Sequence, residues 1–251
     1  MVVSRAKASN NPEVTPDHLL VALLGQQEGV VLPILEKVAQ RYVFRANDYY
    51  LRLIDWTNPA DPIKQLIIPR SEELNDWGKL DASNEAAVTV TPGVQHKYRD
   101  TVLLLCNEVC GAYCRYCFRK RLFMNDNEEV SKDVSAGVEY IRTHPEVTNV
   151  LLTGGDPLIM GTRRLREIIS QLREIEHVKI IRIGTKMPAF NPFRFLDDPE
   201  LHSVFREFST PEKRLYVMCH FDHPREMTAQ AEAVPRRVRE ERHLHDDHDA
   251  E

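Results

Sequence analysis

The stretch "DTVLLLCNEVCGAYCRYC", residues 100–117, joins a short apolar run to four closely spaced cysteines. The run "VLLLC" is continuously apolar, which is typical of a strand buried on both faces of a parallel sheet. Cys110, Cys114 and Cys117 follow it with the spacing C-x3-C-x2-C. Open α/β folds bind their ligands at the carboxyl ends of the strands. The sequence therefore predicts a ligand site where this strand ends.

Apolar runs and amphipathic patterns alternate along the rest of the chain. Further strands are predicted over 148–155, 178–185 and 214–221, and helices over roughly 130–143, 162–175 and 196–208. The second helix has its apolar residues at positions 165, 168, 169 and 172, which form one stripe. Strands that alternate with helices of this length indicate βαβ units and a parallel sheet. The predicted fold class is therefore α/β.

Composition and charge exclude several classes of protein. The chain has 33 basic and 38 acidic residues, a net charge of −5, which gives no reason to expect nucleic acid as a partner. No apolar run approaches the length of a membrane span, so no membrane partner is expected. The first residues, "MVVSRAKASNNPEV", lack the apolar core of a signal peptide, which favours the cytoplasm. Thiols stay reduced there, so a tight cysteine cluster indicates a metal or catalytic site rather than disulfides.

The number of cysteines bears on the kind of metal site. A zinc site usually recruits a second Cys or His pair, and the chain has no second C-x2-C. Three thiolates on one loop instead suit three irons of a [4Fe-4S] cluster, and the fourth iron is then open to a ligand. Cys106 and Cys219 lie within apolar strands and are predicted to be small core residues. A metal site at the terminal "HLHDDHD" is a weaker hypothesis than a disordered polar end.

The cysteine motif resembles that of the radical S-adenosylmethionine (SAM) superfamily, with Tyr116 as its aromatic position. Together with "NVLLTGGDPL", "IIRIGTKMP" and "HFDHP", it resembles the lysine 2,3-aminomutase family. The similarity covers about residues 41–230. It implies a partial TIM-like (βα) radical SAM barrel, with the site at the carboxyl ends of its strands. Only about four βα units are recognised, so the barrel is expected to be truncated, with an α-helical N-terminal extension.

The resemblance also implies roles for single residues. The three spaced cysteines would ligate the cluster, and Tyr116 would pack on the adenine of SAM. Gly154, Gly155 and Asp156 match a segment that receives the methionine part of SAM. Glycines allow a close approach of backbone to a ligand, and a carboxylate suits an ammonium group.

Three further polar residues carry expectations from the same resemblance. Arg119 matches the arginine that binds the substrate carboxylate, a task for which a guanidinium is well suited. Arg115 is expected to contribute only positive charge near the cluster. His220 matches the "HFNHP" segment of the family and is expected to face SAM. Asp222 replaces the Asn of that segment, which puts any hydrogen bond donated there in doubt.

The family's chemistry uses three cofactors and an electron donor. A low-potential electron reduces the cluster, which cleaves SAM to methionine and a 5′-deoxyadenosyl radical. Pyridoxal phosphate (PLP) then carries the amino group from C2 to C3 of an amino acid or a lysyl substrate. The PLP-binding lysine of the family lies after the "HFNHP" segment, and this chain has no lysine after Lys213.

Both ends of the sequence depart from the aminomutase pattern. Residues 10–38 resemble one amino-terminal repeat of Clp-type chaperones, although a plain helical hairpin is an equal alternative. The predicted divisions are a helical extension over 1–40, a wrapping region over 41–98, the radical SAM core over 99–228 and a disordered polar tail over 229–251.

Three hypotheses about function follow from these departures. In the first, the chain is a truncated or frame-shifted aminomutase with impaired catalysis. In the second, it is a working SAM-cleaving enzyme without PLP that is completed by dimerisation or by a complementing chain. The third hypothesis is a non-catalytic cluster-binding or chaperone-associated interaction protein.

Overall fold

The computed structural model describes residues 13–14, 37–38, 40–75, 78–124 and 129–246. The chain divides into two compact units. Residues 1–83 and 110–127 make up the first unit, and residues 84–109 and 128–251 make up the second. The sequence analysis had assigned the cysteine loop to the same division as the strands, whereas in the structure it belongs to the unit of the N-terminal region.

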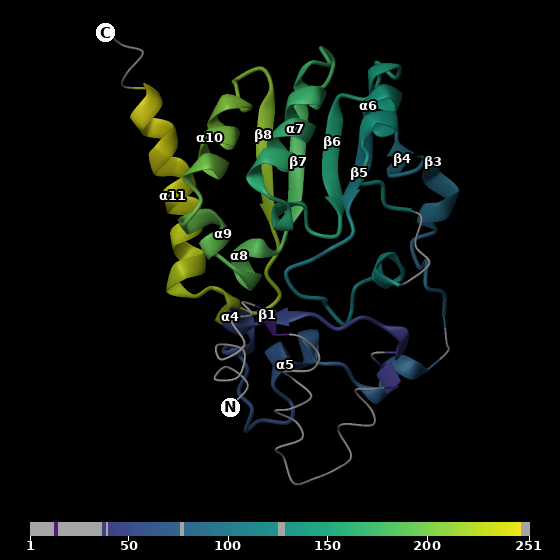
Figure 1. The fold of residues 1–251 in the computed structure, drawn as a ribbon, viewed down its shortest axis with the longest axis vertical. Coiled ribbons are helices and arrows are strands. Elements are labelled where there is room, and N and C mark those ends of the chain that lie inside the picture. Colours follow the sequence, from purple (N-terminus) through teal and green to yellow (C-terminus); the bar gives the residue numbers. More distant parts are fainter. Residues whose placement is uncertain (1–12, 15–36, 39, 76–77, 125–128, 247–251) are drawn as a thin grey trace. The chain divides into compact units, whose positions relative to one another are not determined.

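The second unit is built on a six-stranded sheet with the order β3-β4-β5-β6-β7-β8. Its first two pairings are antiparallel, and the pairings from β5 to β8 are parallel (Figure 1). The strands are β3 (Thr89–Thr91), β4 (Val94–Tyr98), β5 (Thr101–Asn107), β6 (Asn149–Gly154), β7 (Ile180–Thr185) and β8 (Arg214–Cys219). The four parallel strands and the α/β class are thus confirmed. Among the described strands β3 and β8 stand at the two ends of the order, and the barrel remains a prediction.

The antiparallel strands β3 and β4 were not predicted. They are short, and β4 has the sequence "VQHKY", in which only Val94 and Gln95 are buried. Such a segment has neither a continuous apolar run nor a full alternation of apolar and polar residues. Its pairing with β5 is decided by tertiary contact, since Val94 lies opposite Leu104.

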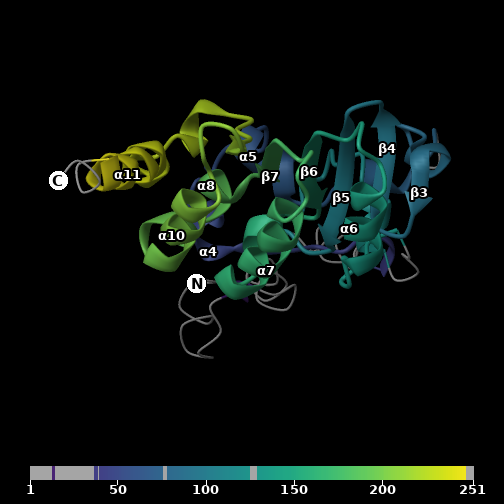
Figure 2. The same cartoon turned by 90° about the horizontal axis from the view of Figure 1, so that it is seen from above.

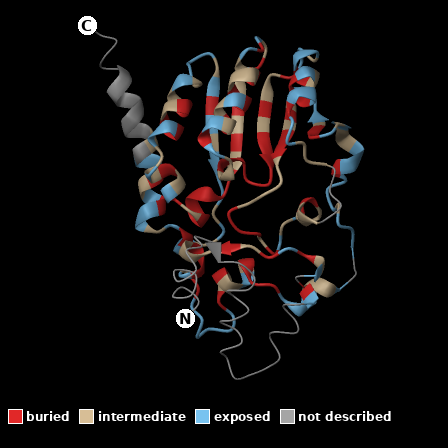
Figure 3. Ribbon diagram, viewed as in Figure 1, coloured by how far each residue is buried: buried red, intermediate tan, exposed pale blue. Residues whose placement is uncertain are grey.

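Three helices lie along one face of this sheet (Figures 1 and 2). They are α6 (Ser135–Arg142), α7 (Thr162–Arg173) and α10 (Pro199–Glu207). Figure 3 shows buried residues on these helices and on the strands behind them. The predicted stripe of α7 is confirmed, because Leu165, Ile168, Ile169 and Leu172 are all fully buried in the core. Burial of this face provides most of the stabilisation of such a helix.

The ends of these helices differ from the predicted ends for local reasons. Helix α6 begins later than predicted, next to Asp133, whose carboxylate accepts the N–H of Ser135. The helix predicted over 196–208 begins instead at Pro199, with Asp198 accepting the N–H of Leu201 as its cap. The residues before it form the separate short helices α8 (Met187–Phe190) and α9 (Phe193–Leu196).

The C-terminal segment forms a helix where the sequence analysis expected a disordered tail. Helix α11 spans Ala229–Asp246, and Ala231 and Val234 on its first turns are buried. These two small apolar residues give the helix a narrow contact with the core. The segment is otherwise mostly polar, so its sequence did not indicate this contact. None of the helices in the described ranges is both long enough and apolar enough to cross a bilayer.

The first unit consists of short elements. They are β1 (Glu13–Val14), which pairs with β2 (Ala46–Asn47), followed by α4 (Asp48–Leu51), α5 (Pro62–Ile67) and the 3-10 helices η1 (Ser71–Leu74) and η3 (Lys120–Phe123). Backbone hydrogen bonds tie the cysteine loop to this region, from Tyr113 to Arg45 and from Arg115 to Leu66. Almost all of the Clp-like segment and of the predicted helical extension lies outside the described residues.

We predict that Ile169→Ala lowers the free energy of unfolding by about 2–5 kcal/mol, because it leaves a cavity between α7 and the sheet. Arg163→Ala, on the same helix, removes a side chain that is 91% exposed and should change the value by less than about 0.5 kcal/mol. Chemical denaturation of the two variants measures both effects. Equal losses would contradict the placement of the buried face.

Candidate functional site

The cysteine loop begins three residues after β5 and is shaped by consecutive turns. The N–H of Cys117 donates to the carbonyl of Cys114 at 3.2 Å, and the N–H of Lys120 donates to the carbonyl of Cys117 at 3.1 Å. Helix η3 continues this course from Lys120. Cys117 thus lies where two turns meet, and its backbone position is fixed on both sides.

The burial of the cysteines separates the loop thiols from the strand thiols. Cys110, Cys114 and Cys117 are partly exposed, whereas Cys106 is buried in β5. Burial raises the pKa of Cys106 to about 12, which keeps it a neutral thiol and confirms its prediction as a core residue. The prediction for Cys219 was wrong, because it is exposed on β8, the last strand in the order of the sheet. Within the described ranges, no three His, Cys, Asp or Glu side chains gather around a position for a single metal ion.

Aromatic and cationic side chains alternate with the cysteines of the loop. Tyr116 and Phe118 are about half exposed, at 52% and 49%. Arg119 is buried, and its guanidinium lies 5.0 Å from the centre of the Phe118 ring. The loop therefore presents apolar ring surface beside its thiols, with a cation next to it.

Two more cations of the loop meet on one partly buried carboxylate. Arg115 donates from Nε and Nη2 to Glu73 of η1, the shortest distance being 2.7 Å, and Lys120 Nζ lies 2.5 Å from the same carboxylate. Burial alone would raise the pKa of Glu73, but the hydrogen bonds from Arg115 and Lys120 outweigh it and lower that pKa. The expectation that Arg115 contributes only charge was therefore too limited, since it also holds the loop to η1.

The glycines after β6 lie against the end of β5. Gly154 has φ +107°, and a Cβ on it would lie 2.5 Å from the carbonyl oxygen of Asn107. A Cβ on Gly155 would lie 2.4 Å from the carbonyl oxygen of Val109, in contact with backbone that has no freedom to move aside. Only glycine fits this approach. Asn107 strengthens it, because its side-chain amide donates to the carbonyls of Val109 and Asp156.

Asp156 is buried, and its carboxylate is already engaged. It accepts hydrogen bonds from the N–H of Leu158, the hydroxyl of Thr185 and the N–H of Lys186, at 2.8–3.0 Å. Burial raises the pKa of Asp156 although these hydrogen bonds act in the opposite direction. Through Thr185 and Lys186, Asp156 joins the end of β6 to the end of β7.

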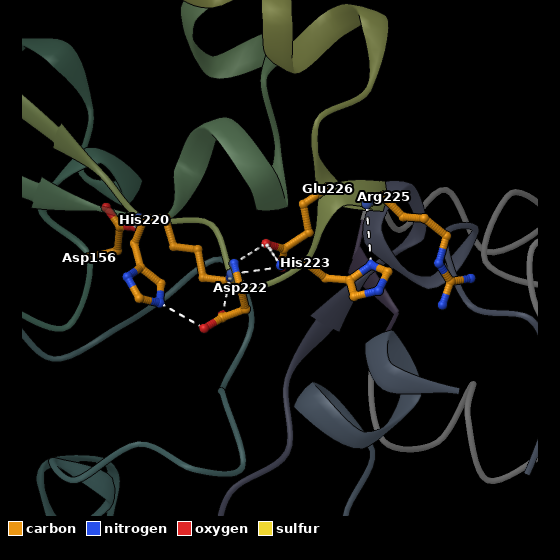
Figure 4. A network of polar contacts seen from close by, with 7 residues as sticks. Asp156, His220, Asp222, His223, Arg225 and Glu226 are labelled. Carbon is orange, nitrogen blue, oxygen red and sulfur yellow. Dashed lines mark hydrogen bonds and ion pairs between the residues drawn. The ribbon is translucent and has the colours of Figure 1, made fainter. Parts of the chain in front are cut away.

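A second buried network links the ends of β7 and β8 (Figure 4). Lys186 donates from Nζ to Asp222 at 2.6 Å and to Glu226 at 2.7 Å, and the side chain of Glu226 is completely buried. The other oxygen of Asp222 lies 2.9 Å from Nε2 of His220. The side chain of Asp222 therefore accepts hydrogen bonds. This agrees with the expectation that Asp222 cannot replace a hydrogen bond donated by the Asn of the family segment.

Comparison with known proteins identifies the relatives of these motifs. No protein-family model matches the chain. It is 61% identical over 198 residues to a protein named "Putative L-lysine 2,3-aminomutase" from Aquifex aeolicus, an alignment that covers 78% of this chain and 53% of the relative. The chain is homologous to lysine 2,3-aminomutases. It is also 39% identical to the L-lysine 2,3-aminomutase of Acetoanaerobium sticklandii (73% of this chain, 44% of the relative) and 32% identical to the glutamate 2,3-aminomutase of Clostridioides difficile (78% and 46%).

The chain spans about half the length of the curated aminomutases that it matches. These relatives are named as lysine or glutamate 2,3-aminomutases. The homology thus supports the family that the cysteine, GGD and "HFDHP" motifs indicated.

The structure brings some of the predicted residues of this aminomutase homologue together. In the second unit, Thr185 connects Asp156 to His220, since its hydroxyl donates to Asp156 and its carbonyl accepts the N–H of His220. The predicted residues of the cysteine loop, including Tyr116 and Arg119, lie together in the first unit.

The sequence analysis missed Glu73, Lys186 and Glu226. Lys186 directly follows one predicted strand, and Asp222 and Glu226 follow the next predicted strand. A cation after one strand and two acidic residues after the neighbouring strand were the signal that could have indicated this network. Glu73 had no comparable signal, because 42 residues separate it from Arg115.

We predict that Gly155→Ala destabilises the protein by about 2 kcal/mol or more, because the added methyl group overlaps the backbone of Val109. Gly161→Ala is the matched control, since a Cβ there meets nothing within 4 Å, and only the weaker preference of alanine for the N-cap of α7 should lower stability, by about 1 kcal/mol or less. Thermal and chemical unfolding of both variants test this. A neutral Gly155→Ala would show that the two strand ends do not approach as described.

We also predict that Lys186→Met costs about 3–5 kcal/mol of stability, because it leaves the Asp222 and Glu226 carboxylates buried without their cation. Lys179→Met makes the same substitution at an exposed position just before β7 and should be nearly neutral. Urea denaturation of the two variants measures the difference. Similar midpoints would exclude a structural role for the Lys186 network.

Proposed function

We propose that this chain is a radical SAM enzyme of the aminomutase class, which binds a [4Fe-4S] cluster through Cys110, Cys114 and Cys117 and cleaves SAM. The observation that best supports the proposal is the position of three partly exposed thiols on one turn-rich loop. The homologues of the chain that contains this loop are named aminomutases. Arg115 and Lys120 lie on the same loop and supply positive charge. The proposed electron donor is a low-potential reductant, and the proposed substrate is an amino acid.

The donor set of the loop fits an iron–sulfur cluster. Thiolates are the usual ligands of such clusters, and three of them leave one iron without a protein ligand. In a four-iron cluster each of the three thiolates would bind a different iron. When bound, the cluster supplies the electron that cleaves SAM and the open iron that holds it.

The loop's other side chains support binding of SAM and substrate. Tyr116 offers exposed ring surface for stacking on an adenine. Arg119 carries the guanidinium proposed for the substrate carboxylate, since its planar donors match a carboxylate in two hydrogen bonds. Phe118, next to the guanidinium, helps to orient it.

The strand ends of the second unit supply the other proposed contacts. The turn at Gly154 and Gly155 has no side chains and therefore allows the methionine part of SAM to approach the backbone. Asp156 shapes this turn through its hydrogen bonds to Leu158, Thr185 and Lys186. We infer that the backbone next to Asp156 meets the ligand, because its carboxylate is committed within the protein. His220, 57% exposed, is the proposed contact to SAM from β8.

The lysine that binds PLP in the family has no match at the positions of this sequence that follow the "HFDHP" segment. The chain carries no lysine after Lys213, and Lys186, at the end of β7, is held by two carboxylates. We therefore derive no step through PLP. The activity proposed for this chain is SAM cleavage. Migration of an amino group is the reaction for which the longer relatives are named.

Anaerobic reconstitution with iron and sulfide, followed by a dithionite-driven assay for 5′-deoxyadenosine, tests this proposal. We expect about four iron and four sulfide per chain, as in a [4Fe-4S] protein. The variant with Cys110, Cys114 and Cys117 all changed to Ala should bind no cluster and form no 5′-deoxyadenosine. Cys219→Ala, which removes a thiol outside the loop, should behave like the unaltered chain. Failure of the unaltered chain to bind iron and sulfide, or retention of the cluster by the triple variant, would refute the proposed site.

A further inference from the structure

The first unit holds a trio of largely buried charged side chains, one from η1 and two from the cysteine loop. Glu73, Arg115 and Lys120 have side-chain exposures of 12%, 6% and 19%. Arg115 comes directly after Cys114, and Lys120 comes three residues after Cys117. One carboxylate therefore holds the chain both before and after Cys117.

The bonds of the trio constrain both side chain and backbone. Arg115 uses Nε and Nη2 on Glu73, while its Nη1 donates to the carbonyl of Val43 at 2.9 Å. Glu73 is itself anchored, because its Oε1 accepts the N–H of Arg70 at the start of η1. Lys120 Nζ lies over the ring of Tyr42, 4.5 Å from its centre. Charge-assisted, two-pronged bonds of this kind fix geometry better than single neutral ones.

The charges of the trio do not cancel. Two cations and one carboxylate leave one surplus positive charge, which is shielded from water by burial. Three thiolates on a cluster core of charge +2 make an anion of charge −1. The surplus positive charge is thus of the size and sign that offsets such an anion, and nearby charge is one of the factors that set the potential of an iron–sulfur cluster.

We propose that Glu73 is a positioning residue for the cluster: it holds Arg115 and Lys120 on both sides of Cys117 and leaves one positive charge on the loop that carries the three cysteines. This inference rests on the proposed function for the cluster, but the holding of the loop does not. The N-terminal region is then part of the cluster site, because η1 supplies the residue that organises the loop.

Hydrogen exchange of the protein without cluster tests the positioning role. In Glu73→Gln the carboxylate loses its charge and its bonds to Arg115 and Lys120 weaken, so amides of residues 113–124 should exchange about tenfold faster or more. Glu72→Gln is the matched control, since Glu72 is the adjacent residue of η1, is 61% exposed and pairs only with Arg70 and Ser71. Peptides from β6 serve as an internal standard in both variants. Unchanged exchange over 113–124 in Glu73→Gln would overturn the proposal.

The midpoint potential of the reconstituted cluster tests the charge role, which a purely structural residue would not show. Glu73→Gln raises the charge of the trio to +2 and should raise the potential, while Lys120→Gln lowers the charge to 0 and should lower it. Glu72→Gln should leave the potential as it is. Shifts of the same sign in both trio variants would overturn the charge role. Absence of a cluster in the unaltered chain would refute both the proposed function and this charge role. Hydrogen exchange of the cluster-free protein would still test the positioning role.

Discussion

The residues after β5 lie very close to the residues after β6. The arrangement of the strand ends in the second unit depends on this constraint. Gly155 donates its N–H to the carbonyl of Asn107, and Asp156 donates its own to the carbonyl of Val109. No side chain fits between these backbones at Gly154 or Gly155. These backbone hydrogen bonds hold Asn107 and Val109 of the second unit against the residues that follow β6.

Ion pairs of low exposure then connect segments that are distant in the sequence. Lys186 joins β7 to the loop after β8 through two carboxylates, and Glu73 joins η1 to the cysteine loop through two cations. Each network has one unbalanced charge, negative in the first case and positive in the second. Removing water from such groups is costly unless their hydrogen bonds are satisfied, and Glu73, Arg115 and Lys186 each make at least two such bonds. Their arrangement ties residues next to the proposed site to the stability of the fold.

The parallel strands and the apolar stripe of α7 were predictable because their signal is local. A strand such as β5 buries consecutive residues, and α7 repeats its apolar residues with helical period. The short antiparallel strands and α11 were not predicted because few of their residues are apolar, so neither the strand period nor the helical period of apolar residues stands out. Cys219 was placed wrongly for a related reason, since an apolar strand is buried only where a neighbouring element covers it.

The sequence by itself determined the thiol spacing, the glycine pair and the likeness to the aminomutases, because each depends on residues close together in the chain. Only the tertiary structure decided which charges meet. Glu73 and Arg115 are 42 residues apart and Lys186 and Glu226 are 40 apart, so neither pair leaves a local pattern. The commitment of the Asp156 carboxylate was likewise invisible, because its partners Thr185 and Lys186 arrive from another strand. Electrostatic interactions act through space, and the folded chain alone sets the distances and the burial that give them their strength.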